Sequence, residues 1–349
     1  MAPVLLAYCR AGFEAECAQE AAARAAGSDI TGHIRARPDS ALVTFHPDLP
    51  GEASGWVEGQ APSDWVFARQ LLASAGLLKD LPPGDRAGPI AELAAALDRP
   101  FRQLVLESPD TNEGRSLAAL LRPLRAPLLG ALADAGVEIG IATAQDDLHV
   151  CFVGTGACHV ATGRVALAAP WPMGIPRVRA RGRPPSRSAH KLAEAFLVFL
   201  GDSPRVEPGS PAVDLGAAPG GWASQLLAAG MHVIAVDNGP LAPSLLETGQ
   251  VTHRREDGFR YRPDAPVEWM VCDMVESPSR VARLAAEWVR DGACRQTIFN
   301  LKLPMKRRWD EVQRAREIVA EVLAGRRHAL RMKQLYHDRE EVTAWLALR

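Results

Sequence analysis

The stretch Asp214-Leu-Gly-Ala-Ala-Pro-Gly-Gly-Trp222 determines how the second half of the chain folds. The apolar residues 212–215 predict a buried strand, and residues 223–229 predict a helix that starts directly after the glycines. Glycines at such a strand-to-helix turn let the backbone approach a ligand closely, and the first turn of the helix offers unpaired N–H groups. The stretch therefore predicts a ligand-binding loop at the end of a strand.

The order of residues within this loop limits the class of ligand that it can bind. The glycines and the proline follow one another as Gly216, Pro219, Gly220 and Gly221, which is not the GxGxxG order of dinucleotide-binding loops. The central proline, and Asp214 two residues before the first glycine, favour a nucleoside ligand without a pyrophosphate. The pattern DLGxxPGGW resembles motif I of S-adenosylmethionine-dependent methyltransferases, in particular of the RNA ribose 2′-O-methyltransferases.

Strands and helices alternate around the loop, from residue 186 to residue 349. The first helix is expected at residues 188–200, with Ser188 or Ser186 as its cap. Further strands are predicted at residues 231–236, 251–254, 268–273, 296–303, 329–334 and 342–348, and further helices at residues 241–248, 278–290 and 309–325. This alternation predicts a doubly wound, Rossmann-like sheet that is mostly parallel. The last two strands have a short connection, so they must pair antiparallel.

Two aspartates after the next strands fit a nucleoside ligand. Asp237 ends the second strand of the sheet, 21 residues after Gly216, and an acid at this position suits a ribose diol. Asp257 follows the third strand, where it is placed to accept a hydrogen bond from an adenine amine. Either residue alone is more typical of a turn cap, so the prediction depends on their register with the glycine loop.

A second group of polar residues is predicted at the same edge of the sheet. Asp273 and Lys302 end the fourth and fifth strands, and ligands bind outside the carboxyl ends of parallel strands. Lys191 lies on the helix that leads into the domain, and the antiparallel last strand begins at this edge, with Glu341 or Glu340. We expect a catalytic tetrad of Lys191, Asp273, Lys302 and Glu341, with Glu340 as the alternative fourth member. A Lys-Asp-Lys-Glu tetrad is the signature of the methyltransferase class that the loop resembles.

The lysines suit the removal of a proton from a ribose 2′-hydroxyl. Only five of the 40 basic residues are lysines, and lysine can lose its proton when buried whereas arginine cannot. A lysine with the ordinary pKa of about 10.4 is protonated at neutral pH, so it must be shifted to act as a base. Burial and a second cation favour the neutral amine. We therefore expect Lys191 to lower the pKa of Lys302. Asp273 and Glu341 would orient the two amines, although their negative charges oppose this lowering of the pKa.

Other acceptor atoms are less well supported. Asp273 is followed by Met-Val-Glu-Ser-Pro rather than by the (Asp/Asn)-Pro-Pro-(Tyr/Phe) loop of amino-group methyltransferases. The Pro-Cys pair that a 5-methylcytosine enzyme needs is also missing at this place. Both observations favour oxygen as the acceptor. Two alternatives remain open: a non-catalytic RNA-binding or ribosome-assembly protein, and a methyltransferase that acts on a base amine.

The first part of the chain has a different pattern. Residues 1–168 mix short strands with helices, which predicts an α+β region, and no catalytic motif is visible there. Strands are expected at residues 4–9, 41–46, 103–107, 148–153 and 164–168, helices at 13–26, 90–97 and 115–135, a loop at 51–64, and a strand or helix at 65–73. Residues 169–185 form a Pro/Arg-rich linker, and residues 186–349 form the catalytic domain. The linker arginines are either solvated or in contact with phosphates.

Composition sets further limits. The chain has 349 residues, enough for about two domains, and 47% of them are hydrophobic. Residues 1–165 carry 13 basic and 20 acidic residues, and residues 166–349 carry 27 and 21, so the second half is the side expected to meet an anionic partner. No apolar run reaches the roughly 18–20 residues of a membrane helix, and the N-terminus lacks a basic start. The six cysteines contain no CxxC pair. We expect a cytoplasmic protein without a metal site.

Longer stretches narrow the resemblance to one family. PSRSAHKLAEAF, DLGAAPGGW, VDNGPLAPSLLETGQVTHRREDGF, WMVCDMVESP, IFNLKLPMKRRW and QLYHDREEVT are similar to the bacterial ribosomal RNA large subunit methyltransferase M family. This resemblance implies an N-terminal THUMP-type RNA-binding region. It also implies transfer of a methyl group from S-adenosylmethionine to the ribose 2′-OH of the cytidine at position 2498 of 23S rRNA.

The resemblance also implies roles for single residues. Lys302 would accept the proton. The residues that would contact the cofactor are Ser188, Gly216, Ala218, Pro219, Gly220, Gly221, Asp237, Asp257 and Asp273. The family often has cysteine where this chain has Ala218, a change that a backbone contact tolerates. The residues expected to meet RNA are Arg177, Arg179, Arg181, Arg183, Arg187, Lys306, Arg307 and Arg308. We expect a monomer that acts on 23S rRNA, either free or in an early precursor of the large subunit.

Overall fold

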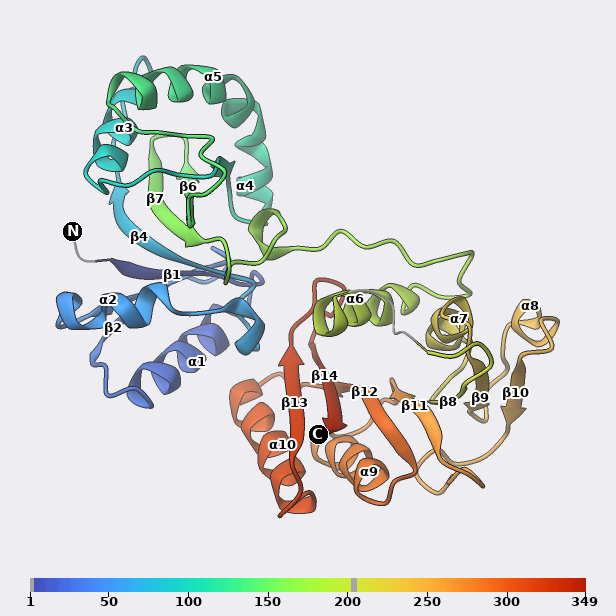
Figure 1. The fold of residues 1–349 in the computed structure, drawn as a ribbon. Helices are drawn as coiled ribbons and strands as arrows, with labels where there is room; N and C mark the ends of the chain where they lie inside the picture. The colour runs from blue at the N-terminus through green and yellow to red at the C-terminus, as the bar shows by residue number, and fades with distance from the viewer. Residues whose placement is uncertain (1–2, 202–205) are drawn as a thin grey trace. The chain divides into compact units, whose positions relative to one another are not determined.

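The computed structural model describes residues 3–201 and 206–349, and the chain folds into two compact units. The units are Met1–Ile175 and Pro176–Arg349, so the division lies within the Pro/Arg-rich segment 169–185 (Figure 1). Each unit contains one seven-stranded sheet.

The sheet of the first unit has the strand order β2-β3-β1-β4-β7-β6-β5. Its strands are β1 (Val4–Tyr8), β2 (Gly32–Ala36), β3 (Leu42–Pro47), β4 (Gln70–Leu78), β5 (Leu104–Glu107), β6 (Asp146–Gly154) and β7 (Ala157–Arg164). Neighbouring strands are antiparallel, except that β5 and β6 are parallel. The long strand β4 joins the two halves of the sheet and has an irregular register between Ser74 and Gly76.

Helices pack on both halves of this sheet. In the first half, α1 (Glu14–Ala26) contacts β2 and β3, and α2 (Pro50–Glu58) contacts β1 and β4. In the second half, α3 (Ala87–Ala95) packs against α5 (Ala118–Asp134). The short helix α4 (Asn112–Ser116) and two 3₁₀ helices, Pro62–Asp64 and Pro172–Gly174, complete the unit. The region is therefore a mixed α/β structure.

Several expectations for the first unit were wrong in detail. Residues 51–64 were expected to be a loop, but α2 forms there because Trp56 packs against Phe45, with ring centroids 5.5 Å apart. This packing outweighs the low helix propensity of glycine and proline. The strand expected at residues 164–168 is a turn, because Leu167 and Ala168 donate their N–H groups to the carbonyl of Arg164. Strands β2 and β7 were missed, and the helix expected at 115–135 is divided into α4 and α5.

The second unit contains the doubly wound sheet, with strand order β10-β9-β8-β11-β12-β14-β13. Its strands are β8 (Pro211–Leu215), β9 (His232–Val236), β10 (Val251–Arg254), β11 (Val267–Cys272), β12 (Cys294–Lys302), β13 (His328–Lys333) and β14 (Glu341–Leu348). The five strands β8 to β12 are parallel. The predicted antiparallel pairing of the last two strands is confirmed, and β14 also pairs antiparallel with β12. The sheet thus brings the start of β14 to the end of β12.

Five helices accompany the second sheet: α6 (Ala189–Leu200), α7 (Gly221–Ala228), α8 (Pro243–Leu246), α9 (Pro278–Arg290) and α10 (Arg308–Val322). Helices α6 and α7 pack together, as do α9 and α10, and the two pairs lie on opposite faces of the sheet (Figure 1). Leu192 and Phe196 of α6 and Trp222 of α7 are buried against Trp269 of β11 and Ile298 of β12. This packing fixes α6, and with it Lys191, against the sheet.

Two expectations about the whole chain concern cysteines and membranes. All six cysteines are buried, as expected of small apolar side chains. Within residues 3–201 and 206–349, none of the helices combines the length and the apolarity that crossing a membrane requires.

Glu194 ties helix α6 to the turn between β13 and β14. Its carboxylate is 1% exposed and accepts hydrogen bonds from the backbone N–H groups of Tyr336 (2.7 Å) and His337 (2.9 Å). It also accepts a bond from Nδ1 of His337, at 2.6 Å. Charged acceptors of this kind hold neutral donors more strongly than neutral acceptors do. The turn that leads into β14 is therefore anchored by one buried side chain.

We expect Glu194→Ala to lower the free energy of unfolding by about 3 kcal/mol, because three donors lose a charged acceptor. Chemical denaturation followed by circular dichroism measures this loss. Glu317→Ala is the matched control: Glu317 also lies on a helix but pairs with Arg314 at an exposed position, where ion pairs contribute little. Equal stability losses in the two variants would contradict the anchoring role of Glu194.

Candidate active site

The glycine loop joins β8 to α7 and leaves no room for side chains. Gly220 has φ +111°, in the left-handed region, and a Cβ on it would lie 2.0 Å from Cδ1 of Leu245. A Cβ on Gly221 would lie 2.2 Å from Oγ of Ser188 and 2.3 Å from Oγ of Ser186. The two serines bond each other at 2.6 Å. The loop is therefore packed directly against the start of α6, which carries Lys191 one turn later.

Asp237 connects the end of β9 to this loop. One carboxylate oxygen accepts the N–H of Ala218 at 3.0 Å, and the other accepts the N–H of Gly239 at 2.7 Å. Each oxygen has a further lone pair, so the carboxylate retains the capacity to accept hydroxyl donors. The backbone contacts hold this carboxylate beside the loop without using all of its acceptor capacity.

Asp257 lies in the loop after β10 and is half exposed, with 52% of its side-chain surface accessible. Its Oδ1 accepts the N–H of Phe259 at 2.9 Å, and its Oδ2 lies 3.6 Å from Nε of Arg260. The residue thus caps a turn. Among the residues that the structure describes, its second oxygen contacts the side chain of one exposed arginine, Arg260, which a ligand can displace.

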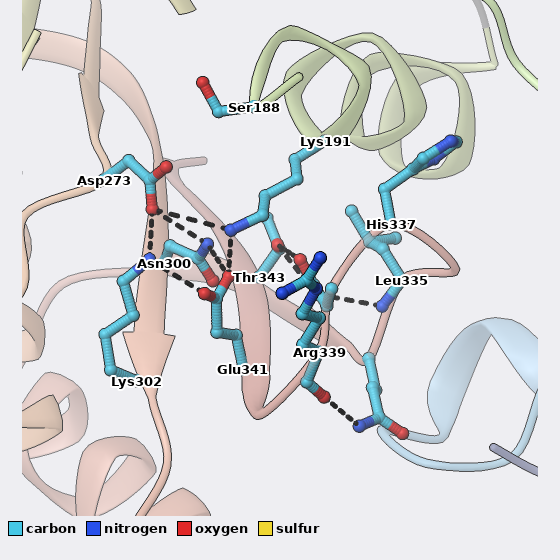
Figure 2. Close-up of polar contacts among 12 residues, drawn as sticks. Ser188, Lys191, Asp273, Asn300, Lys302, Leu335, His337, Arg339, Glu341 and Thr343 are labelled. Atoms are coloured by element: carbon cyan, nitrogen blue, oxygen red, sulfur yellow. Dashed lines mark hydrogen bonds and ion pairs between the residues drawn. The ribbon is translucent and has the colours of Figure 1, made fainter. Parts of the chain in front are cut away.

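The four residues expected to form a tetrad lie together at the carboxyl edge of the sheet (Figure 2). Nζ of Lys302 donates to Oδ1 of Asp273 and, at 3.0 Å, to Oε1 of Glu341. Nζ of Lys191 donates to Oε2 of Glu341 and lies 3.9 Å from Oδ1 of Asp273. The side chains are 13–21% exposed, so the cluster is partly shielded from water but open to a ligand. Two positive and two negative charges balance.

The pKa of Lys302 differs from the expectation. Burial lowers the pKa of this amine, but the carboxylates of Asp273 and Glu341 raise it by more, so that it lies above its ordinary value. The expectation that Lys191 would lower the pKa of Lys302 is therefore wrong for the protein without its ligands. For Glu341, burial raises the pKa, but Lys191 and Lys302 lower it by more, and the net direction is down. Both shifts favour the charged forms.

Register decides which glutamate joins the cluster. Glu341 is the first residue of β14 and pairs with Lys302 across the sheet, whereas Glu340 is directed outward and binds Arg308. The turn before β14 is held by Asp338, which is fully buried. Its carboxylate accepts the N–H of Leu335 at 3.0 Å and the hydroxyl of Thr343 at 3.0 Å. Burial first, and Glu341 next, raise the pKa of Asp338 well above its ordinary value.

Asn300 is a polar residue of the site that the sequence analysis did not identify. It is fully buried in β12, two residues before Lys302, and therefore lies on the same face of the strand. Its Nδ2 donates to Oδ1 of Asp273 at 3.0 Å and to Oε2 of Glu341 at 2.6 Å. The signal in the sequence was a lone asparagine within the apolar run IFNLKL, since a buried strand seldom carries an unpartnered amide.

A second buried acid lies at the base of the glycine loop. Asp214 is fully buried in β8, and its pKa is raised to about 8, mainly by burial. The charges of Asp273 and Asp237 contribute to this rise, while a hydrogen bond from the backbone of Ala223 opposes it. Asp214 is therefore largely protonated at neutral pH and adds little negative charge to the ligand loop.

The residues expected to contact RNA lie in two groups. Arg177, Arg179, Arg181, Arg183 and Arg187 are all exposed on the segment that leads into α6. The backbone of Arg181 is fixed by Gln225 of α7, which exchanges two hydrogen bonds with it, at 3.0 and 3.2 Å. In the second group, Lys306 is exposed, and Arg307 is exposed with Asp310 at 3.7 Å. Arg308 is partly buried and binds Glu340.

Comparison with known families matches three parts of the chain. Residues 1–72 match the RlmM ferredoxin-like domain, residues 85–163 match the N-terminal domain of ribosomal RNA large subunit methyltransferase M, and residues 184–326 match the FtsJ-like methyltransferase family. The first two matches divide the region expected to be THUMP-like, residues 1–168, into a ferredoxin-like domain and a second domain. The third match contains the glycine loop, Asp273 and Lys302.

Relatives are similar over nearly the whole chain. Ribosomal RNA large subunit methyltransferase M of Methylococcus capsulatus is 48% identical over 351 residues, which is 99% of this chain and 98% of that protein. The protein of the same name from Xanthomonas oryzae pv. oryzae is 46% identical, with 99% of each chain covered. Among solved structures, TrmN from Thermus thermophilus is 15% identical and covers 99% of this chain and 100% of its own, with a TM-score of 0.36, and no inference rests on it. The chain thus belongs to the ribosomal RNA large subunit methyltransferase M family.

Proposed function

We propose that this protein transfers a methyl group from S-adenosylmethionine to the ribose 2′-hydroxyl of a cytidine in 23S rRNA, at position 2498. The observation that carries the proposal is the cluster of two lysines and two carboxylates beside the glycine loop. The family supports methylation of ribosomal RNA. The choice of the ribose oxygen comes from the cluster, because its lysines can accept a proton from a hydroxyl.

The residues around the glycine loop fit the methyl donor. The glycines bring the backbone of the loop against the start of α6, since a Cβ on Gly221 would clash with Ser188. Asp237 offers acceptor capacity for a ribose diol, and Asp257 offers a carboxylate for an adenine amine. Asp214 is largely protonated at neutral pH and adds little negative charge beside Asp237. When bound, S-adenosylmethionine supplies an electrophilic methyl group together with a positive charge that favours the free amine of a nearby lysine.

Lys302 is the proposed proton acceptor. In its free-amine form, Nζ would take the hydroxyl proton as the ribose oxygen forms its bond to the methyl carbon, and the lysine would end as an ammonium group. The bond between the methyl carbon and the donor sulfur would break at the same time, and the sulfur would leave as a neutral thioether. Lys191 adds a positive charge on the far side of Glu341, and the two carboxylates hold both amines in place. Holding the reacting groups in line supplies much of the rate.

RNA is proposed to bind along the exposed arginines. Arg177, Arg179, Arg183 and Arg187 lie on the segment next to the loop, and Lys306 and Arg307 follow Lys302. Recognition of the rRNA by the first unit, residues 1–168, is part of the same proposal. Phosphate contacts supply affinity but no sequence specificity. Removing charges on this face should therefore weaken RNA binding most at low salt and make the affinity less dependent on salt.

The direct test is transfer of labelled methyl from S-adenosylmethionine to unmodified 23S rRNA, followed by alkaline hydrolysis and mapping. Methylation of the 2′-oxygen leaves the adjacent linkage resistant to alkali, so a resistant labelled cytidine supports the proposal. Label on a base amine would assign the protein to another acceptor. Folded protein that binds the donor but labels neither free rRNA nor precursor particles would contradict the proposed role of the tetrad.

We expect Lys302→Met to abolish methyl transfer while the Kd for S-adenosylmethionine stays unchanged, because the side chain acts on the acceptor hydroxyl. Lys302→Arg should also be inactive, since arginine does not lose its proton near neutral pH. Radiolabel transfer and calorimetric titration measure the two properties. Lys79→Met, an exposed lysine of the first unit, is the control. Substantial transfer by Lys302→Met would refute the assignment of Lys302.

The raised pKa of Lys302 also predicts how the rate depends on pH. Because the raised pKa favours the ammonium form, the reactive amine is a minor species at neutral pH, and its fraction grows as pH rises toward the pKa. We expect the rate of methyl transfer in single turnovers to increase from pH 7 to pH 9. A rate that is flat over this range would show that the proton is not transferred to Lys302.

We expect Asp237→Ala to raise the Kd for S-adenosylmethionine about 10- to 100-fold, since a hydrogen bond to a charged group contributes about 1.5–3 kcal/mol. Calorimetric titration measures the affinity. Asp264→Ala removes an exposed aspartate of a neighbouring loop and should leave the affinity unchanged. Unchanged affinity in Asp237→Ala would remove this residue from the donor site.

A further inference from the structure

The amide of Asn300 joins the two carboxylates of the tetrad. Asn300 is fully buried, and its Nδ2 donates one hydrogen bond to Asp273 (3.0 Å) and one to Glu341 (2.6 Å). These two acids come from different strands, β11 and β14, which flank β12 on either side. The neutral amide of Asn300 thus links two carboxylates that lie on opposite sides of it.

Chemistry fixes the orientation of this amide. If it were flipped, the acceptor Oδ1 would face two carboxylate oxygens, and no hydrogen bond could form between the amide and either acid. In the observed orientation Oδ1 is buried and has no hydrogen-bond partner among residues 3–201 and 206–349. Leaving an acceptor unpaired costs free energy. Oδ1 of Asn300 therefore stays unpaired within the described residues so that Nδ2 can donate to both acids.

The bridge determines which carboxylate oxygens remain available. Over residues 3–201 and 206–349, the side-chain contacts to Asp273 from Lys302, Asn300 and Lys191 all involve Oδ1. The second oxygen of Asp273 points away from the lysine amines in Figure 2. Glu341 divides its two oxygens, with Oε1 toward Lys302 and Oε2 toward Asn300 and Lys191. Rotation of either carboxylate would break its bond to Asn300.

We propose that Asn300 is a positioning residue, which locks the carboxylates of Asp273 and Glu341 so that Lys302 is aimed at the acceptor hydroxyl and the outer oxygen of Asp273 stays free for a ligand. This inference rests on the proposed function and adds a fifth member to its tetrad. A neutral donor suits this role because it holds both acids without a third positive charge. An additional lysine or arginine would compete with Lys302 for the same oxygens.

The test removes the two N–H donors of Asn300 with side chains of two different sizes. Asn300→Leu removes both N–H groups, and Asn300→Thr keeps one hydroxyl donor. We expect kcat for methyl transfer to fall about 10- to 100-fold in Asn300→Leu, with an intermediate loss in Asn300→Thr, because misplaced reacting groups react slowly. The KM for S-adenosylmethionine should stay within about twofold, since this loss concerns orientation and not binding.

Two readouts separate positioning from packing. Without its donors, the carboxylate of Glu341 becomes easier to protonate, so its pKa, followed by carbon NMR of labelled glutamate, should rise. The acid limb of the kcat–pH profile, which reports Lys302 in the proposed function, should also move to higher pH, because carboxylates that lose the Asn300 donors hold the Lys302 ammonium group more strongly. Thr297→Val is the control, because Thr297 is equally buried in β12 but its hydroxyl faces Sδ of Met270 at 3.5 Å. This control should move neither readout.

The outcomes are distinct. A kcat that falls equally at every pH, with the titration of Glu341 unchanged in both variants, would overturn the proposal and leave Asn300 a packing residue. A full kcat in Asn300→Leu would overturn it as well. If the wild-type protein methylates no ribose but the pKa of Glu341 still rises in Asn300→Leu, the positioning role stands and the proposed function fails.

Discussion

The contact of Lys302 with Asp273 and Glu341 is the constraint on which the second unit depends. Charges that are only 15–21% exposed are costly to remove from water, and they persist only if each finds a partner with good geometry. The partners come from three adjacent strands and, through Lys191, from α6. The sheet must therefore place the ends of β11 and β12 and the start of β14 at one edge, and α6 must pack against that edge. Asn300, buried between the two acids, reduces the cost further by supplying donors that carry no charge.

The reversed direction of β14 is the feature of the topology that makes this arrangement possible. A parallel strand in the same place would bring its carboxyl end, and not Glu341, to the active edge. Because β14 is inserted antiparallel between β12 and β13, its first residue lies beside Lys302. The turn before it is then constrained from two sides, by Glu194 of α6 and by Asp338 within the turn. Stability and the proposed catalysis share these contacts, since the residues that anchor the turn also decide where Glu341 points.

The electrostatics that hold Lys302 in place oppose its proposed use as a base. The carboxylates that orient Lys302 also raise its pKa, which opposes its use as a base. Burial acts in the other direction and is the larger single effect, but the two acids together exceed it. The protein alone therefore favours an ordered ammonium group over a free amine. At the base of the glycine loop, burial outweighs the other effects and keeps Asp214 largely protonated. This removes a negative charge that would otherwise act on the same site.

The sequence by itself determined the class of the second unit and most of its site. Local patterns sufficed for this: glycines at a strand-to-helix turn, acids at strand ends and apolar runs of strand length each report a structure set by neighbours in the chain. What depends on distant segments was decided only by the tertiary structure. Helix α2 exists because Trp56 packs on Phe45, although its own residues favour a loop. The choice of Glu341 over Glu340 follows from strand register, since side chains alternate between faces. The contacts of Asn300 and the upward shift of the Lys302 pKa depend on how β11, β12 and β14 lie beside one another. The distances between residues of different strands cannot be read from a local sequence pattern.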